Sequence, residues 1–333
     1  MRHPVEAPLF RSWFAVLTVL LAASQFLQAQ DAPQPQRPPG LQQKPATPSA
    51  PSPSTPAPSS APAQAAPAPG NSAKTEQVIP ASAARHFHQG FSFESDGIVE
   101  NAILEYQAAI KEYPDYFEAH YNLGGIYLDR HGYAEAITEL KAAVRIKPED
   151  ANAHNNLGLA LKHNRDFAGA ATEYREAVRL NPKMATAQNN LANVLYAQRD
   201  YNGAIQHYRA ALELEPRSAE THLNLGSVLD DAGRPDEAIA EYKEALKLQP
   251  KSASAHYNLS IVYQKKKDIP TAIAELREAA KLSPDWPTPH IMLTNLLKDS
   301  DPKSALDECI VADGLTHDAK LHDECQELQK KAR

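Results

Sequence analysis

The chain has 333 residues and a formal net charge of −7, with 34 lysine and arginine residues against 41 aspartate and glutamate residues. A phosphate-binding protein usually carries a basic patch, whereas these cations alternate with carboxylates, so the composition gives no reason to expect a nucleic-acid partner. The length could hold two domains, but the residue pattern favours one array preceded by two segments without a core.

Residues 1–29 are predicted to be a signal peptide. Arg2 and Arg11 give a positive start, residues 13–23 form an uncharged apolar run, and Ala29 offers a small residue at the cleavage position. The apolar run is about half of the ~20 residues that a membrane-spanning helix needs. We therefore expect cleavage and export to the periplasm or the outside of the cell, with a bacterial envelope as the setting. The alternative is an uncleaved membrane anchor.

Residues 30–80 are predicted to be a disordered linker. Fourteen of the 27 prolines fall between Pro33 and Pro80, among alanine, serine and glutamine. No apolar periodicity is present, so this stretch cannot bury a core. A semi-extended spacer is the favoured interpretation, and a disordered leader without a specific ligand is the alternative.

A 34-residue period runs through the rest of the chain. Prolines recur at this period: Pro114, Pro148, Pro182, Pro216, Pro250 and Pro284. Leucines follow the same period: Leu123, Leu157, Leu191, Leu225, Leu259 and Leu293. A fixed period of this length indicates a stack of one small unit and not a globular enzyme fold.

The repeating unit reads as two helices. Within residues 117–150, Leu123 marks an apolar stripe on a first helix, Gly132 marks a turn, Leu140 lies on a second stripe, and Pro148 ends the second helix. Small residues are expected to let the two helices approach closely: Gly124, Ala136 and Ala143.

This pattern resembles the tetratricopeptide repeat family. The resemblance implies an all-α, right-handed solenoid of about seven helix-turn-helix repeats over residues 81–333. Six full repeats are expected at 83–116, 117–150, 151–184, 185–218, 219–252 and 253–286. A seventh begins at Pro287, its second helix (304–312) is out of phase by about one residue, and residues 317–331 are predicted to form a capping helix.

The resemblance implies a ligand on the concave surface that the first helices line. One column there is asparagine: Asn122, Asn156, Asn190, Asn224 and Asn258. An amide both donates and accepts hydrogen bonds, which suits it to a peptide backbone of any sequence. The column is similar to the asparagine ladder that holds extended polypeptide in O-linked N-acetylglucosamine transferases, although no such catalytic domain is expected here. The alternative is that these amides satisfy groups between neighbouring repeats.

Other surface positions complete the predicted peptide site. The positions where chaperone-binding repeats carry a carboxylate clamp hold Phe87, Tyr121, Asn155, Asn189, Leu223 and Tyr257. Capture of a terminal carboxylate is therefore not expected, though Lys162 and Lys265 lie nearby. The aromatic residues are expected to stack on a bound chain: Phe87, Phe91, Tyr121, Tyr196 and Tyr257. Alternatively, Phe87 and Phe91 pack under the segment near Val78 and Ile79.

Six histidines follow the repeat: His86, His120, His154, His222, His256 and His290. Rings in successive repeats lie too far apart to share one ion, so we expect packing residues and no metal site. No phosphate loop, metalloprotease motif or nucleophile turn is present, which predicts a protein that is not an enzyme and has no cofactor.

The two cysteines, Cys309 and Cys325, fall in the predicted cap. Antiparallel helices on either side of Gly314 would bring them within reach, and an exported protein would meet oxidising conditions. We predict a disulfide, with two buried free thiols as the alternative.

The sequence thus favours an exported, non-catalytic scaffold or assembly factor that binds a protein or extended peptide. Two alternatives stay open. The chain could be an accessory subunit that delivers a substrate chain to a separate envelope enzyme, or a structural envelope protein tethered through a retained signal segment.

Overall fold

The computed structural model describes residues 78–332, and every element of regular structure among them is an α-helix. These residues belong to one compact unit, residues 73–333. The predicted signal peptide, and the predicted linker up to residue 77, lie outside the described residues.

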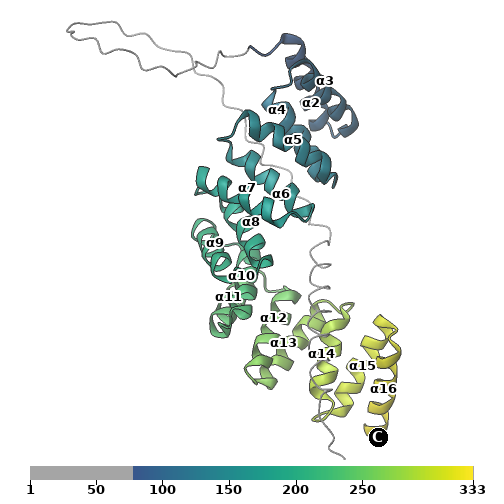
Figure 1. Cartoon of the computed structure of the whole chain (residues 1–333). Coiled ribbons are helices and arrows are strands. Elements are labelled where there is room, and N and C mark those ends of the chain that lie inside the picture. The colour runs from purple at the N-terminus through teal and green to yellow at the C-terminus, as the bar shows by residue number, and fades with distance from the viewer. Residues whose placement is uncertain (1–77, 333) are drawn as a thin grey trace, which may run out of the picture. The chain divides into compact units, whose positions relative to one another are not determined.

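Seven helix pairs and one final helix make up the array (Figure 1). The first helices of repeats 1 to 7 are α2 (Ala81–Ser95), α4 (Phe117–Asp129), α6 (Ala151–His163), α8 (Ala185–Ala197), α10 (Ala219–Asp231), α12 (Ala253–Lys265) and α14 (Pro287–Leu297). The second helices are α3 (Val99–Glu112), α5 (Tyr133–Ile146), α7 (Phe167–Leu180), α9 (Tyr201–Leu214), α11 (Pro235–Leu248), α13 (Ile269–Leu282) and α15 (Pro302–Thr316). The final helix is α16 (Ala319–Lys331). The predicted repeats and capping helix are confirmed.

Short polar side chains begin many of these helices. Asp150 caps α6 by accepting a hydrogen bond from the amide N–H of Ala153, and Asp166 caps α7 in the same way through Gly169. Such caps satisfy N–H groups that have no partner inside the helix. They help to fix where the helices that carry them begin.

The turn inside each of the first six repeats contains one residue with left-handed backbone. Its φ angles lie between 61° and 75° at Gly97, His131, Arg165, Arg199, Gly233 and Lys267. Gly132, the predicted turn residue, has a φ of −81° and is the N-cap of α5. The prediction located the turn, but the left-handed position is one residue earlier, and four of its six occupants are not glycine.

The helices pack in sequence order. Each first helix packs on the second helix of its own repeat, and each second helix packs on the first helix of the next repeat. In addition, first helices contact one another across repeats: α4 with α6, α6 with α8, α8 with α10, and α10 with α12. We call the surface formed by α2, α4, α6, α8, α10, α12 and α14 the first-helix surface.

Large buried side chains on the second helices face glycines on the first. A Cβ atom added to Gly158 would lie 2.7 Å from the ring of Tyr174, and one added to Gly226 would lie 2.6 Å from the ring of Tyr242. At Gly124 the nearest atom, 2.6 Å away, belongs to Leu140. Contacts this short exclude a side chain, so the predicted role of small residues in close helix approach is confirmed.

The C-terminal end departs from the repeat as predicted. His290 and Glu308 are paired across 18 residues, whereas the same pair is separated by 19 residues in earlier repeats, which confirms the one-residue phase shift of α15. The helix α16 packs on α15, with Leu321, Cys325 and Leu328 buried. A disulfide joins Cys309 to Cys325, with an Sγ–Sγ distance of 2.08 Å.

Between residues 78 and 332, no helix combines the length and the apolar composition that crossing a bilayer requires.

Candidate functional site

The repeated histidines join the two helices of each repeat. Their Nδ1 atoms lie 2.6–2.7 Å from glutamate Oε2 atoms in the pairs His86–Glu105, His120–Glu139, His154–Glu173, His222–Glu241, His256–Glu275 and His290–Glu308. In three repeats the other ring nitrogen lies 3.0–3.2 Å from the carbonyl oxygen of Pro114, Pro148 or Pro216. Each such ring therefore links its own second helix to the loop before its first helix.

Repeat 4 contains the same contact with the residues exchanged. Gln188 replaces the histidine on the first helix, His207 replaces the glutamate on the second, and the His207 Nδ1–Gln188 Oε1 distance is 2.7 Å. Burial lowers the pKa of His207. Within the described part of the chain, no three metal-ligating side chains come together. The histidines thus act as specific helix-pairing residues, a role more defined than the predicted packing.

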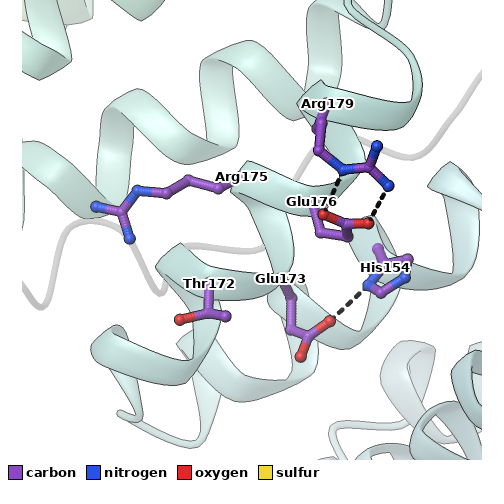
Figure 2. Close-up of a pocket in the computed structure, with 6 residues that line it drawn as sticks. All are labelled: His154, Thr172, Glu173, Arg175, Glu176 and Arg179. Carbon is purple, nitrogen blue, oxygen red and sulfur yellow. Dashed lines mark hydrogen bonds and ion pairs between the residues drawn. The ribbon is translucent and has the colours of Figure 1, made fainter. Parts of the chain in front are cut away.

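A shallow hollow lies on the side of repeat 3, between α6 and α7 (Figure 2). Its charged groups pair with one another: His154 with Glu173, and Arg179 with Glu176 at 2.6 and 2.8 Å. The hydrogen bonds from Arg179 lower the pKa of Glu176, and Arg175 points away from the other side chains in Figure 2. Because most of its polar groups are already satisfied, this hollow offers less to a ligand than the first-helix surface.

Four of the five predicted ladder asparagines bond to the preceding repeat. The bonds run from Asn122 Nδ2 to Tyr106 OH (3.1 Å), from Asn156 Nδ2 to Tyr121 OH (3.1 Å), from Asn190 Nδ2 to Asn155 Oδ1 (3.0 Å), and from Asn258 Nδ2 to Ser227 Oγ (3.4 Å). These contacts support the alternative in which the amides hold neighbouring repeats together. Asn224 is half-buried like the other four, but it differs from them because its side chain forms no hydrogen bond among residues 78–332.

Side-chain links also run directly from one first helix to the next. Each joins residues 35 apart: Tyr121 with Asn156, Asn155 with Asn190, Tyr196 with Asp231 (2.7 Å), and Asp230 with Lys265 (2.7 Å). The hydroxyl of Tyr196 donates to Asp231. Burial of the side chain and, to a lesser extent, this hydrogen bond raise the pKa of Tyr196. We call these contacts the inter-repeat links. They join α4, α6, α8, α10 and α12 in series, each to the next, through polar side chains of the first-helix surface.

Unused hydrogen-bonding capacity on this surface is concentrated on α8 and α10. Asn189 accepts from Thr221 Oγ1 (3.3 Å) and Asn193 accepts from Tyr208 OH, so in both residues only the carbonyl oxygen is engaged. Their amide groups have two further donors each. Together with Asn224, they leave donors and acceptors facing the surface at mid-array. Asn193 was not predicted as a site residue, because it lies outside the asparagine column.

The predicted aromatic residues divide into packed and exposed rings. Phe87 packs against Tyr106 and Tyr116, with ring centroids 5.6 and 5.0 Å apart. Phe91 is 55% exposed and Val78 is 88% exposed, so neither covers the other. Packing thus describes Phe87, with Tyr106 and Tyr116 among its partners, while Phe91 is exposed.

Of the three remaining rings, Tyr196 takes part in an inter-repeat link, and the other two are partly packed in the array. Tyr121 stacks on Phe117 (5.7 Å) and Tyr257 lies against Trp286 (4.7 Å). Burial raises the pKa of Tyr121 and of Tyr257. Both rings are half-buried, so each contributes to packing and still presents an edge to the surface.

Comparison with known proteins agrees with this geometry. The tetratricopeptide repeat family matches residues 96–151, 126–185, 183–251 and 223–287. No curated protein matches the chain.

Several solved structures are similar. MamA is 26% identical, with 52% of this chain and 94% of that chain covered and a TM-score of 0.49. PilF of Pseudomonas aeruginosa is 24% identical, with 63% and 96% covered and a TM-score of 0.54, a likeness that shows the fold. YrrB, described as a TPR protein with an unusual peptide-binding site, is 18% identical, with 56% and 97% covered and a TM-score of 0.48. The resemblance to O-linked N-acetylglucosamine transferases stays a prediction.

Seven helix pairs with a 34-residue repeat, and family matches that run from residue 96 to residue 287, lead to one conclusion. The chain belongs to the tetratricopeptide repeat family.

Proposed function

We propose that this protein is an exported, non-catalytic scaffold whose first-helix surface binds an extended peptide or a segment of a partner protein. Membership of the tetratricopeptide repeat family supports protein–protein interaction as the general role. The observation that carries the proposal is the unused amide capacity of Asn189, Asn193 and Asn224 on α8 and α10. A peptide backbone alternates N–H and C=O groups, and amides can pair with both.

The surface suits an extended chain better than a compact ligand. First helices follow one another directly, so the amide groups recur from repeat to repeat at about 10 Å, the usual spacing of packed helices. An extended polypeptide advances about 3.3 Å per residue, so three residues span one repeat. A segment of about 20 residues would cover all seven first helices.

Site-specific photo-crosslinking in the producing cell tests this function. A photoreactive residue at position 224 is expected to capture one protein in high yield, which mass spectrometry of the adduct identifies. A matched probe at Thr172, an exposed residue on the second helix α7, is expected not to capture it. Equal capture at both positions would contradict a site on the first-helix surface. An enzyme captured at position 224 would support the accessory-subunit alternative.

Export is part of the proposal and rests on the sequence of residues 1–29. Cell fractionation followed by N-terminal sequencing is expected to find the protein outside the cytoplasm, beginning near Gln30. Intact cytoplasmic protein beginning at Met1 would overturn the proposed compartment and leave the binding surface unaffected.

A further inference from the structure

Lys162 lies at a position of the first-helix surface that forms inter-repeat links in repeats 4 and 5 but not in its own repeat. Lys162, Tyr196 and Asp230 occupy the same position in repeats 3, 4 and 5, since each lies 34 residues from the next. Tyr196 bonds to Asp231 and Asp230 bonds to Lys265, in both cases with the residue 35 positions further on. The equivalent neighbour of Lys162 is Ala197, which has no group that can pair with an ammonium.

The charged group of Lys162 therefore has no direct partner in the described part of the chain. The side chain is half-buried, and no hydrogen bond or ion pair of Lys162 occurs among the residues that the structure describes. Burial lowers the pKa of Lys162, and the carboxylate of Glu220 on α10 opposes part of that shift. Glu220 is itself exposed and makes no ion pair with Lys162 within residues 78–332. Partial burial of an unpaired charge is unfavourable, so a complementary group would be stabilising there.

The charge near Lys162 favours a group with one negative charge. Glu220 is the carboxylate that acts on Lys162, and it would repel a doubly charged phosphate group more strongly than a singly charged carboxylate. Asp230 and Asp231, on the same helix, already have partners in Lys265 and Tyr196. One unpaired lysine and one ligand carboxylate balance in charge.

We infer that Lys162 binds a carboxylate of the polypeptide held on the first-helix surface, beside the unused amides of α8 and α10. This inference rests on the proposed function and adds a sequence preference to it: the bound segment carries an acidic group opposite repeat 3. An aspartate or glutamate side chain and a free C-terminus present the same carboxylate chemistry. The site differs from the carboxylate clamp considered from the sequence, because that clamp needs cations at positions that here hold Asn155 and Asn189.

A random peptide library displayed with free C-termini and panned on the full-length protein provides the first test. Peptides of about twelve residues are long enough to cross three or four first helices. Enriched peptides are expected to share one acidic residue, or a common C-terminal segment. Enrichment without either feature would overturn the carboxylate site but leave peptide binding intact. Failure to enrich any peptide would contradict the proposed function itself.

Binding of one selected peptide, measured by fluorescence anisotropy, then identifies the residue and the source of the carboxylate. Lys162→Met is expected to raise the Kd of the acidic peptide about tenfold, the effect of losing one charged hydrogen bond. If Lys162 binds an acidic side chain, the same variant should leave the Kd of the peptide with Glu→Gln unchanged. If Lys162 binds the C-terminal carboxylate, it should instead leave the Kd of the C-terminally amidated peptide unchanged. Equal losses for acidic and neutral peptides would overturn the inference.

Two further variants serve as control and counter-test. Lys298 occupies the same position in repeat 7 but is paired with Asn295 and Glu324, so Lys298→Met is expected to leave the preference for acidic peptides unchanged. Ala197→Asp supplies Lys162 with the partner that it lacks, at an exposed position on α8. This variant should bind the acidic peptide about tenfold more weakly without loss of helicity. Unchanged binding by Ala197→Asp would contradict the assignment even if Lys162→Met failed to fold.

Discussion

The contact between the two helices of a repeat and the surface formed by the first helices follow different rules. The helix–helix contact is nearly the same from repeat 1 to repeat 7, with a His–Glu pair in six repeats and its exchanged form in the other. On the first-helix surface, one position holds Phe87, Tyr121, Asn155, Asn189, Leu223 and Tyr257 in turn. A contact that every unit must make keeps one set of residues, whereas a surface that meets different parts of a ligand varies along the array.

The comparison predicts that stability and binding depend on different residues. Leu191→Ala, at a position only 1% exposed, is expected to lower the free energy of unfolding by about 3 kcal/mol, because it leaves a cavity between helices. Asn224→Ala, on the first-helix surface, should change it by less than about 0.5 kcal/mol. Urea unfolding monitored by circular dichroism gives both values. A loss of stability at Asn224 equal to that at Leu191 would break the distinction.

The disulfide extends the comparison to the C-terminal end, where it joins the second helix of repeat 7 to the capping helix α16. Cys309 and Cys325 are 16 residues apart, and closing a loop of this size stabilises by about 3 kcal/mol in the chain-entropy model. The double variant Cys309→Ser, Cys325→Ser is expected to speed amide hydrogen exchange in α15 and α16 and leave α4 to α9 unchanged. Intact mass after alkylation, with and without reductant, checks that the bond forms. Two free thiols in protein purified without reductant would contradict the disulfide.

Exchange of the His–Glu pair tests whether the helix–helix contact depends on residue identity or only on complementarity. Glu173→Ala leaves the ring of His154 without its partner on α7 and is expected to cost about 2 kcal/mol. The double variant His154→Gln, Glu173→His copies the arrangement of Gln188 and His207 and should recover most of that loss. Thermal unfolding of the three proteins measures the recovery. A double variant no more stable than Glu173→Ala would show that repeat 4 depends on other compensating residues.

The smallest expected effect concerns the turn between the helices. Arg165 has a φ of 64°, a conformation that costs non-glycine residues about 1 kcal/mol. Arg165→Gly is therefore expected to raise the unfolding free energy by up to about 1 kcal/mol. Gly233, with a φ of 75°, provides the reverse test, because Gly233→Ala should lower stability by a similar amount. Urea midpoints that move in the opposite directions would contradict the assignment of strain.

The elements of the array could be predicted closely because each depends on local pattern. Proline and leucine recur every 34 residues, so helix type, repeat limits and the shift near Glu308 follow from spacing. The limits of single helices are less exact, since the helix expected at 304–312 is Pro302–Thr316. The buried face of α16 could be predicted in the same way from Leu321, Cys325 and Leu328. Local pattern is sufficient here because each repeat contacts only its neighbours.

The contacts of the candidate site could not be predicted from the same information. Glu173 lies 19 residues after His154, a distance that becomes a contact only once the two helices fold back on each other. Asn190 and Asn155 meet because first helices pack with an offset of one residue, which the period does not reveal. The left-handed backbone of Arg165 could not be predicted, because glycine is the usual sign of that conformation and here an arginine adopts it.

The exchanged pair in repeat 4 has a consequence for how such a gene can change. Duplication of a whole 34-residue unit carries both partners together, since Gln188 and His207 lie within one repeat. Recombination between two repeats at the turn would instead join a first helix bearing histidine to a second helix bearing His207. Two imidazole rings would then face each other where a ring and an acceptor belong. Unequal crossing-over can therefore add or remove complete repeats next to repeat 4. It cannot freely combine the first helix of another repeat with the second helix of repeat 4.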